Sequence, residues 1–460
     1  MKYLTTLRLN ELRTYTSTII MKGLKYLLLI ALFSANALNS VAQYSSDSPS
    51  GTLSPYSQFG LGTLQEPQSG FNAGMNGLAI GMRGHNEINS ANPASYSAID
   101  SLTFIFDAGV SGQMTSFEQN DKILNRYTAS IDYISAIFRV AKGVGVSFGL
   151  QPFSQIGYDY NETVYVGNDR TLKFYNTYHS RQTGIQNYYL GIGWSPFKYF
   201  SIGANIGYLH GEMDKNVTNS FSDSNIDTYI KKYQTNINSY KADFGLQAQI
   251  PLSKKDVITI GAAYSLGHSL NADQELLYMH TTSSTGAIDT VKYVAKDAFS
   301  IPHTISAGIS YAHSNKWRFG ADYSLQKWAE LSYPVFKETS GNKSFVMSDN
   351  YYLDRQRITI GGEYCANEMS RKFLDRIRYR LGASYTTPYY KIGNVDGPKE
   401  LSVSAGFAIP IVNGYNNRSV LNISAQWVKA EASGLIKENT FRIKIGFTFN
   451  EQWFMKWKFN

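Results

Sequence analysis

Charged residues recur at alternate positions in the C-terminal half of the 460-residue chain. The groups are Arg355, Arg357 and Glu363, then Arg376, Arg378 and Arg380, then Arg442 and Lys444. Alternate side chains of a β-strand share one face, so each group would line one wall of a cavity. A guanidinium fork matches a carboxylate, which gives the hypothesis that these cations bind the carboxylate of a ligand. The alternative is a solvated interior in which they pair with Glu363, Asp322 and Asp243.

Motifs for catalysis or metal binding are missing from the sequence. The seven histidines are scattered, and there is no HExxH motif, GxSxG elbow or Walker-type loop. Cys365 is the only cysteine, which excludes a disulfide framework and a zinc ribbon. A Ser-His-acid triad assembled across strands stays open as an alternative. We expect no enzyme, no metal and no cofactor.

The composition narrows the class of protein. Aromatic residues make up 14 % of the chain, with 34 Tyr and 25 Phe, so there is ample apolar surface to bury and disorder is excluded. Charged residues are only 17 %, and no run approaches the roughly 20 apolar residues that a membrane-spanning helix needs. A helical membrane bundle is therefore excluded, which leaves a chain rich in tyrosine and glycine and built from β-strands.

The N-terminal residues have the pattern of a secretory signal peptide. Lys22 and Lys25 precede an apolar stretch, and small residues end at Ala42, so we expect residues 1–42 to be removed and Met21 fits as the start. A short buried core helix is the alternative. The leader takes away five basic residues and one Glu, leaving 38 basic against 34 acidic residues. That excess is too small to indicate a nucleic-acid partner.

From about residue 101 the sequence alternates between apolar and polar or small residues. Phe441, Ile443, Ile445, Phe447 and Phe449 share one face, for example, opposite Arg442 and Lys444. We count about fourteen such segments, and the connections between them are short and long in turn. The predicted long connections are residues 115–125, 160–185, 212–238, 269–299, 329–350, 388–399 and 431–439.

An even number of such strands predicts a transmembrane antiparallel β-barrel over residues 101–450. In hydrocarbon every backbone N–H and C=O must be paired within the protein, which a closed sheet achieves. A soluble β-core is the alternative, but the polar faces of these segments are too polar for a two-sided core. The predicted location is the outer membrane of a Gram-negative bacterium, with outer-membrane lipid as a partner.

Residues 43–100 differ in texture, being rich in Ser, Gly, Asn and Pro. Asn92, Pro93 and Ala94 follow a Gly/Ala-rich stretch and come just before the first strand, with Tyr96 two residues on. Together with the strand count and the late segment RYRLGASYTTPYYKIG, this arrangement resembles the FadL/TodX family of outer-membrane transporters for long-chain fatty acids and hydrocarbons. The resemblance implies a fourteen-stranded barrel whose N-terminal segment, residues 43–100, folds inside as a plug.

The resemblance also implies a kinked third strand and a ligand-capture groove. The third segment contains Gly149, Pro152 and Phe153, and a proline removes one donor from the strand ladder. The third and fourth long loops, 212–238 and 269–299, would carry the groove. Its apolar candidates are Met213, Phe221, Tyr229, Leu276, Leu277 and Tyr278.

Two functions follow as hypotheses. The first is a passive transporter of small hydrophobic molecules such as long-chain fatty acids, which works by plug movement and lateral opening at the kinked strand. The second is a FadL-like structural or accessory subunit of a larger outer-membrane assembly or export machine, with outer-membrane proteins as partners. Residues 451–460 mix Trp and Phe with Lys, which predicts a periplasmic amphipathic tail at the membrane surface, or else a partner-docking peptide.

Overall fold

The computed structural model describes residues 54–451, except for 102, 121, 167–171, 340–341 and 412–418. The predicted signal peptide and the C-terminal tail from residue 452 therefore lie outside the described residues. None of the helices in the described part is both long enough and apolar enough to cross a membrane.

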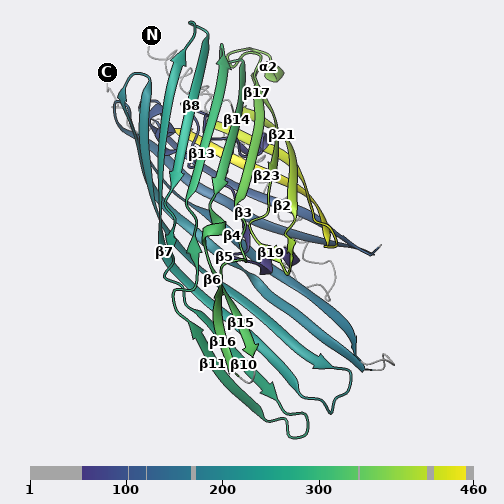
Figure 1. Cartoon of the computed structure of the whole chain (residues 1–460). Coiled ribbons are helices and arrows are strands. Elements are labelled where there is room, and N and C mark those ends of the chain that lie inside the picture. Colours follow the sequence, from purple (N-terminus) through teal and green to yellow (C-terminus); the bar gives the residue numbers. More distant parts are fainter. Residues whose placement is uncertain are drawn as a thin grey trace, which may run out of the picture. The chain divides into compact units, whose positions relative to one another are not determined.

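Fourteen antiparallel strands of the described chain form a closed barrel (Figure 1). Each strand pairs with the next in chain order, and β2 pairs with β23, from Phe104 opposite Glu451 to Glu118 opposite Lys437. The barrel strands are β2 (Phe104–Gln119), β3 (Lys122–Ala141), β4 (Val144–Val166), β5 (Leu172–Phe197), β6 (Phe200–Phe221), β7 (Thr228–Pro251), β8 (Asp256–Ser265), β13 (Thr304–His313), β14 (Trp317–Gln326), β17 (Arg355–Tyr364), β18 (Arg378–Thr386), β21 (Lys399–Ile411), β22 (Ser419–Glu431) and β23 (Lys437–Glu451). The predicted fold class is confirmed.

Alternation along each strand decides which side faces out. On β23 the apolar residues Phe441, Ile443 and Ile445 are exposed, whereas Lys444 between them is buried. The same alternation gives exposed Ile358 and Ile360 on β17 and exposed Leu401 and Val403 on β21. Pairing between neighbouring strands satisfies most of the wall's backbone, and alternation places these apolar side chains on the outside, which suits a barrel in hydrocarbon.

Several strands are far longer than a membrane requires. A spanning strand needs about 9–11 residues, whereas β4, β5, β6 and β7 have 23, 26, 22 and 24. The predicted long loops at 115–125, 160–185 and 212–238 are therefore wrong for most of their length, because the strand ladders continue through them. Side-chain periodicity predicts only the part of a strand that faces lipid. Backbone pairing between neighbouring strands continues beyond the membrane, where that periodicity is absent.

The remaining strands lie at the end of the barrel that carries these long hairpins, which we call the hairpin end. There β10 (Gln274–Thr281) pairs with β7 and with β11 (Ile288–Ala295), beyond the point where β8 ends. Short ladders join β9 (His268–Ser269) to β12 (Ser300–Ile301), β15 (Tyr333–Thr339) to β16 (Asn342–Ser348), and β19 (Lys391–Ile392) to β20 (Val395–Asp396). The opposite end, the short-turn end, has connections such as 142–143 and 314–316 and the helix α2 (Phe373–Arg376).

Residues 54–101 fold inside the barrel, and we call them the plug. They form η1 (Pro55–Gln58), the short strand β1 (Thr63–Leu64), η2 (Ala73–Met75) and η3 (Pro93–Ala98). The helix η2 contacts β17, β18, β21 and β22, and η3 contacts β4 to β7 on the other side. A small apolar core of Phe71, Met75, Leu78 and Met82 lies within the plug.

A larger apolar cluster lies toward the hairpin end. It joins the start of the plug to the barrel wall through Tyr56 and Leu61, and it includes η4 (Trp328–Glu330) with the fully buried Trp328. The rings of Tyr352 and Tyr389 pack on Trp328 at centroid distances of 5.2 and 4.7 Å. Aromatic side chains therefore fill part of the lumen on the side of the plug that faces the hairpin end.

Candidate functional site in the plugged lumen

The motif at Asn92 fixes the end of the plug to the wall. Its side-chain oxygen accepts from the backbone N–H of Ala94 and caps η3, while Nδ2 donates to the carbonyl oxygens of Ile80 (2.9 Å) and Leu246 (3.2 Å). Pro93 begins η3, where a missing N–H costs nothing. Tyr96 is buried and donates to Oδ1 of Asn205 on β6 at 3.1 Å. The four predicted motif residues therefore lie together against the wall.

Glycines of the wall allow the plug backbone to lie directly on the strands. A Cβ at Gly203 on β6 would overlap the carbonyl group of Pro93, and one at Gly261 on β8 would overlap the carbonyl oxygen of Ile80. On the opposite wall, Gly382 on β18 is as close to the backbone of Met75. No other residue type leaves room for this contact, so the plug is packed on backbone rather than on flexible side chains.

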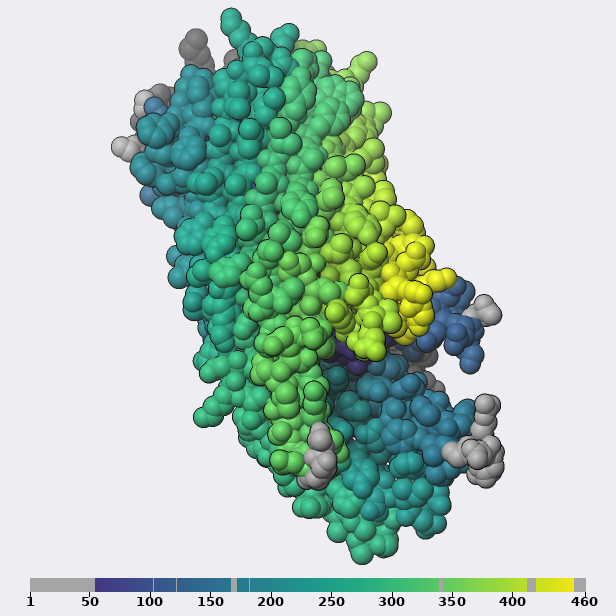
Figure 2. Space-filling view, viewed as in Figure 1, coloured from purple at the N-terminus to yellow at the C-terminus, as the bar shows by residue number. Residues whose placement is uncertain are grey.

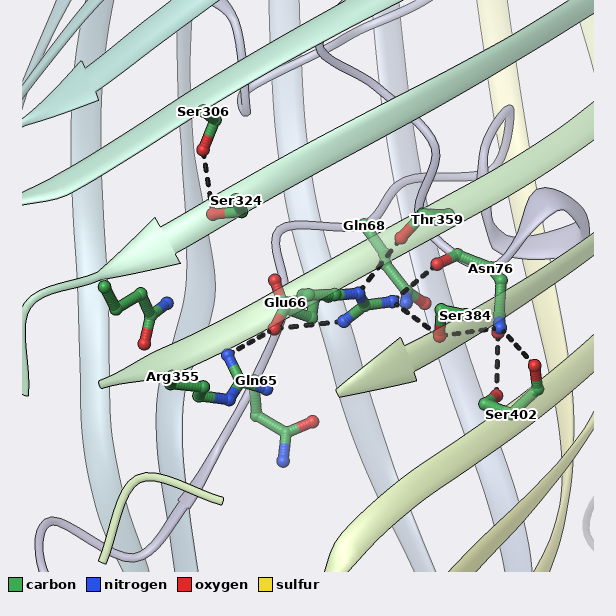
Figure 3. Close-up of polar contacts among 12 residues, drawn as sticks. Gln65, Glu66, Gln68, Asn76, Ser306, Ser324, Arg355, Thr359, Ser384 and Ser402 are labelled. Atoms are coloured by element: carbon green, nitrogen blue, oxygen red, sulfur yellow. Dashed lines mark hydrogen bonds and ion pairs between the residues drawn. The ribbon is translucent and has the colours of Figure 1, made fainter. Parts of the chain in front are cut away.

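A network of charges holds the first part of the plug. Glu66 accepts from Arg355 at 2.7 Å and lies 3.0 Å from Nη1 of Arg357, both on β17 (Figure 3). Arg357 also donates to the carbonyl oxygen of Asn76 at 2.6 Å, and Asn76 donates to Ser384 Oγ at 2.9 Å. Burial raises the pKa of Glu66, but Arg357 and Arg355 outweigh burial and bring the pKa to about 2. The carboxylate is therefore charged at neutral pH.

A second network lies toward the short-turn end. Glu363 on β17 accepts from Arg318 at 2.9 Å and from Arg378 and Arg380 at 2.6 Å each. Arg318 also bonds to Glu87 of the plug, at 2.5 and 2.9 Å. The predicted pairing of the arginines with Glu363 is thus seen for Arg378 and Arg380, and Arg318 links that network to the plug.

The other predicted charged residues are placed differently. Arg376 belongs to α2 rather than to β18, so it does not share a strand face with Arg378 and Arg380. The prediction failed there because the strand begins only at Arg378. On β23, Arg442 donates to Gln113 at 2.7 Å, and Lys444 donates to Gln68 of the plug.

Asp322 and Asp243 do not form the predicted ion pairs with these arginines in the described residues. Asp322 accepts from the backbone N–H groups of Ala79 (2.6 Å), Ile80 (2.8 Å) and Gly81 (3.4 Å), so it caps a turn of the plug. Asp243 bonds to Lys241 and Ser265 on neighbouring wall positions. Backbone donors of the plug compete for carboxylates in a way that side-chain patterns do not reveal.

The predicted kink in the third barrel strand, β4, corresponds to a break in the ladder. Gly149 still pairs with both neighbours, but the register with β5 shifts at Pro152–Ser154 and again at Ile156–Tyr158. Beyond Leu150, β4 has no partner in β3. The short strand β1 of the plug pairs with Ser154 and Gln155 instead, and Phe153 lines a cavity beside it.

The predicted capture residues lie on strands rather than on loops. Met213 and Phe221 belong to β6, Tyr229 to β7, and Leu276, Leu277 and Tyr278 to β10. Met213 and Leu276 are buried. A cavity of about 250 Å³ adjoins Met213, and its wall includes Tyr158, Tyr233 and Tyr333. Of the six candidates, only Met213 lines this cavity.

The cavities of the lumen differ in size, and charged side chains line several of them. Two of about 170 and 150 Å³ flank the plug at Leu64–Glu66, and both are lined by Arg355 and Arg357 together with Gln, Ser and Thr side chains. A third, of about 740 Å³, lies at the short-turn end among Arg83, Glu87 and the Glu363 network. It shares no lining residue with the other two, and the plug lies between them.

Sequence reasoning missed Glu66, Glu87, Asn76 and Arg318. A signal was present, because Glu66 and Glu87 are the only acidic residues between Ser54 and Ile99, whereas arginines are frequent on the facing strands. A carboxylate that is rare in its own segment and faces many cations is a candidate partner for them.

Comparison with solved structures shows the fold. The P. putida toluene transporter TodX aligns with a TM-score of 0.58 and 13 % identity, over 84 % of this chain and 98 % of that one. A Pseudomonas aeruginosa FadL homologue gives 0.59 and 11 %, over 84 % and 99 %. The Ralstonia pickettii toluene transporter TbuX gives 0.56 and 12 %, over 83 % and 98 %. The closed barrel with its apolar outer face is that of an outer-membrane protein of a Gram-negative bacterium.

Comparison of sequences identifies the family. No curated protein matches the chain. The family model BamG matches residues 24–460, which is nearly the whole chain. The protein therefore belongs to the BamG family.

Proposed function

We propose that this protein is a permanently plugged barrel that serves as a structural or accessory subunit of a larger outer-membrane assembly. The observation that carries this proposal is the fixation of the plug. Its backbone lies on wall glycines on opposite sides of the lumen, and its carboxylates Glu66 and Glu87 are bonded to Arg355, Arg357 and Arg318. Membership of the BamG family is compatible with an accessory role.

Movement of such a plug would be costly. Hydrogen bonds to charged groups contribute about 1.5–3 kcal/mol each, and a buried charge left without its partner costs more. Displacing the plug would break the bonds of Glu66, Glu87, Asn92 and Asp322 together. Segments that open readily have few buried contacts, and the plug is the opposite case.

The lumen chemistry also favours a role other than hydrocarbon passage. Ligand pockets usually measure about 300–1,000 Å³ and are mostly apolar, whereas the two central cavities are near 170 and 150 Å³. The larger has a mainly polar lining, and the smaller places Arg355, Arg357 and Glu66 beside apolar side chains such as Phe153 and Trp328. An alkyl chain placed there would remove charges from water without replacing their hydrogen bonds.

The second candidate function is passive transport of small hydrophobic molecules such as long-chain fatty acids. The break between β3 and β4 favours it, because a cavity of about 170 Å³ lies directly behind that break, with Asp132 on one side and Pro152 and Gln155 on the other. In this mechanism ligand would leave sideways through the wall after plug movement. TodX and TbuX, which share the fold, are toluene transporters.

Purification from native outer membranes in mild detergent distinguishes the two. A protein partner at constant stoichiometry supports the subunit role. A barrel that purifies alone, with lipid or another hydrophobic compound in its lumen, supports transport. An uptake assay with a chain lacking residues 44–95 is the complementary measurement. Loss of ligand selectivity on that deletion supports transport, and unchanged uptake counts against it.

A further inference from the structure

One barrel strand has a long backbone edge that no other strand of the described chain pairs with. On one side β3 pairs with β2 from Lys122 to Phe138, nearly its full length. On the other side it pairs with β4 only from Ile134 onward. The edge from Lys122 to Tyr133 is therefore open, and we call it the β3 edge.

The two hairpins beside this edge diverge. In Figure 2 the blue tip of β2 and β3 stands apart from the teal tip of β4 and β5, and residues of the plug are visible in the notch between them. The same divergence is seen in the ribbon (Figure 1). The opening is thus a notch in the wall rather than a closed seam.

Part of the β3 edge lies at the depth of the apolar outer belt. Ile131 and Tyr127 of β3 pair across the ladder with Val110 and Met114 of β2. These four side chains are 62, 61, 52 and 37 % exposed. Unpaired backbone groups are not tolerated against hydrocarbon, where nothing can hydrogen-bond to them. This stretch therefore requires a partner that supplies donors and acceptors.

The plug does not supply that partner. Its strand β1 pairs with Gln155 and Ser154 of β4, and the N–H of Ser54 donates to the carbonyl oxygen of Gly157. These contacts cover the β4 side of the notch. The β3 side remains open, and the register of the described strands gives it no second neighbour.

We propose that the β3 edge binds an extended segment of a partner protein, which adds to the barrel wall as a further strand. This inference rests on the subunit role proposed above and names the place and kind of contact. An exposed strand edge is a template for such addition. The edge has twelve residues, 122–133. Only the stretch around Tyr127–Ile131 lies at the depth of the apolar belt, so the added strand would complete part of the membrane-spanning wall and continue toward the hairpin end.

The two faces of the notch define the chemistry of the added strand. The outer face continues the apolar belt, so its outward residues would be apolar. The inner face borders the cavity that contains Asp132, Gln113 and Gln155, so its inward residues would be polar. Lipid tails could cover the apolar outer face, but they lack hydrogen-bonding groups. They would therefore leave the N–H and C=O groups of the β3 edge, and the polar side chains of this cavity, without partners.

Photo-crosslinking tests the proposal. A photoreactive amino acid is placed in turn at Tyr127, Ala129 and Ile131 in the full chain in native membranes. Ile206 on β6 is the control, since it is 64 % exposed and its strand has neighbours on both sides. We expect several-fold more crosslinked partner at the β3 positions, joined to residues two apart in a single partner segment. Attachment to lipid alone, to a second copy of this chain, or to scattered sites overturns the inference.

Proline substitution gives a second readout. N–H groups of adjacent strand residues point to opposite edges, so of Thr128→Pro and Ala129→Pro one removes a donor facing the notch and the other removes a donor to β2. The variant that removes the donor facing the notch should lose the partner protein, while its barrel stays folded, as judged by its migration in unheated detergent gels. A partner that still co-purifies with both folded variants overturns this inference but leaves the subunit role intact, whereas absence of any partner for the unmodified protein overturns both.

Discussion

Glu66 of the plug and Arg355 of the barrel wall, 289 residues apart in the sequence, are joined by a 2.7 Å charged hydrogen bond. Arg357 lies 3.0 Å from the same carboxylate oxygen. One carboxylate is therefore shared by two guanidinium groups and offsets part of their charge, and the wall would lose this compensation if the plug left.

Replacement of Glu66 by Gln should destabilise the plugged barrel. Loss of one partner from a fully buried ion pair costs about 3–5 kcal/mol. Arg355 and Arg357 are 8 and 13 % exposed but Glu66 is 24 % exposed, so we expect a loss toward the lower end of that range. Thermal unfolding followed by circular dichroism and limited proteolysis of the plug measure the effect. The matched control is Glu118→Gln, whose partner Lys437 is 3.7 Å away and half-exposed, and which should cost at most about 1 kcal/mol. Equal effects for the two variants would contradict the proposed role of Glu66.

The contribution of Glu66 to holding the plug should be constant over a wide pH range. With a pKa of about 2 in the folded protein against an ordinary 4.5, Glu66 stabilises fully above the unfolded value and loses this contribution as pH falls toward 2. The difference in protease resistance of the plug between the unmodified protein and Glu66→Gln should therefore be constant from pH 8 to about 5 and shrink at lower pH. A difference between the two proteins that already disappears near pH 6 would count against this assignment.

Addition of one methyl group to the wall should displace the plug. Gly203→Ala and Gly261→Ala each place a Cβ against plug backbone, which cannot move aside as a side chain can. Overpacking of this kind costs about 1–3 kcal/mol or more. Gly112→Ala on β2 is the control, since nothing lies within 4 Å of its Cβ position. Two measurements test this: thermal stability, and the rate of thiol labelling at a Ser95→Cys reporter in the plug, with the buried native Cys365 as the background. Both Gly→Ala wall variants should unfold at lower temperature and label faster, whereas Gly112→Ala should change neither.

The amide of Asn92 should not be replaceable by a carboxylate. Asn92→Asp keeps the acceptor for Ala94 N–H but loses the donor to the carbonyl oxygens of Ile80 and Leu246, and it sets a negative charge against them. We expect a loss of about 1–3 kcal/mol in the free energy of unfolding. Asn161→Asp on the exposed part of β4 is the control and should change stability little. If both variants unfold alike, the motif does not anchor the plug.

The barrel could be predicted from the sequence because its cause is local. Alternation such as Phe441 to Phe449 fixes which side of a strand faces lipid, and Pro152 marks the break in β4. The hairpins around 212–238 were missed because pairing with a neighbour, not amphipathicity, keeps them extended. The Glu66 and Asp322 contacts were missed since they join distant residues, and no property of either residue alone specifies its partner.

The glycine-lined wall also constrains the order of biogenesis. The plug precedes β2 in the chain, and the ladder between β2 and β23 joins the first barrel strand to the last. A segment whose backbone must rest on bare strand backbone cannot be threaded afterwards through a finished ring. The plug must therefore dock on the wall strands before β2 and β23 pair, so that plug docking and barrel closure belong to one step of folding.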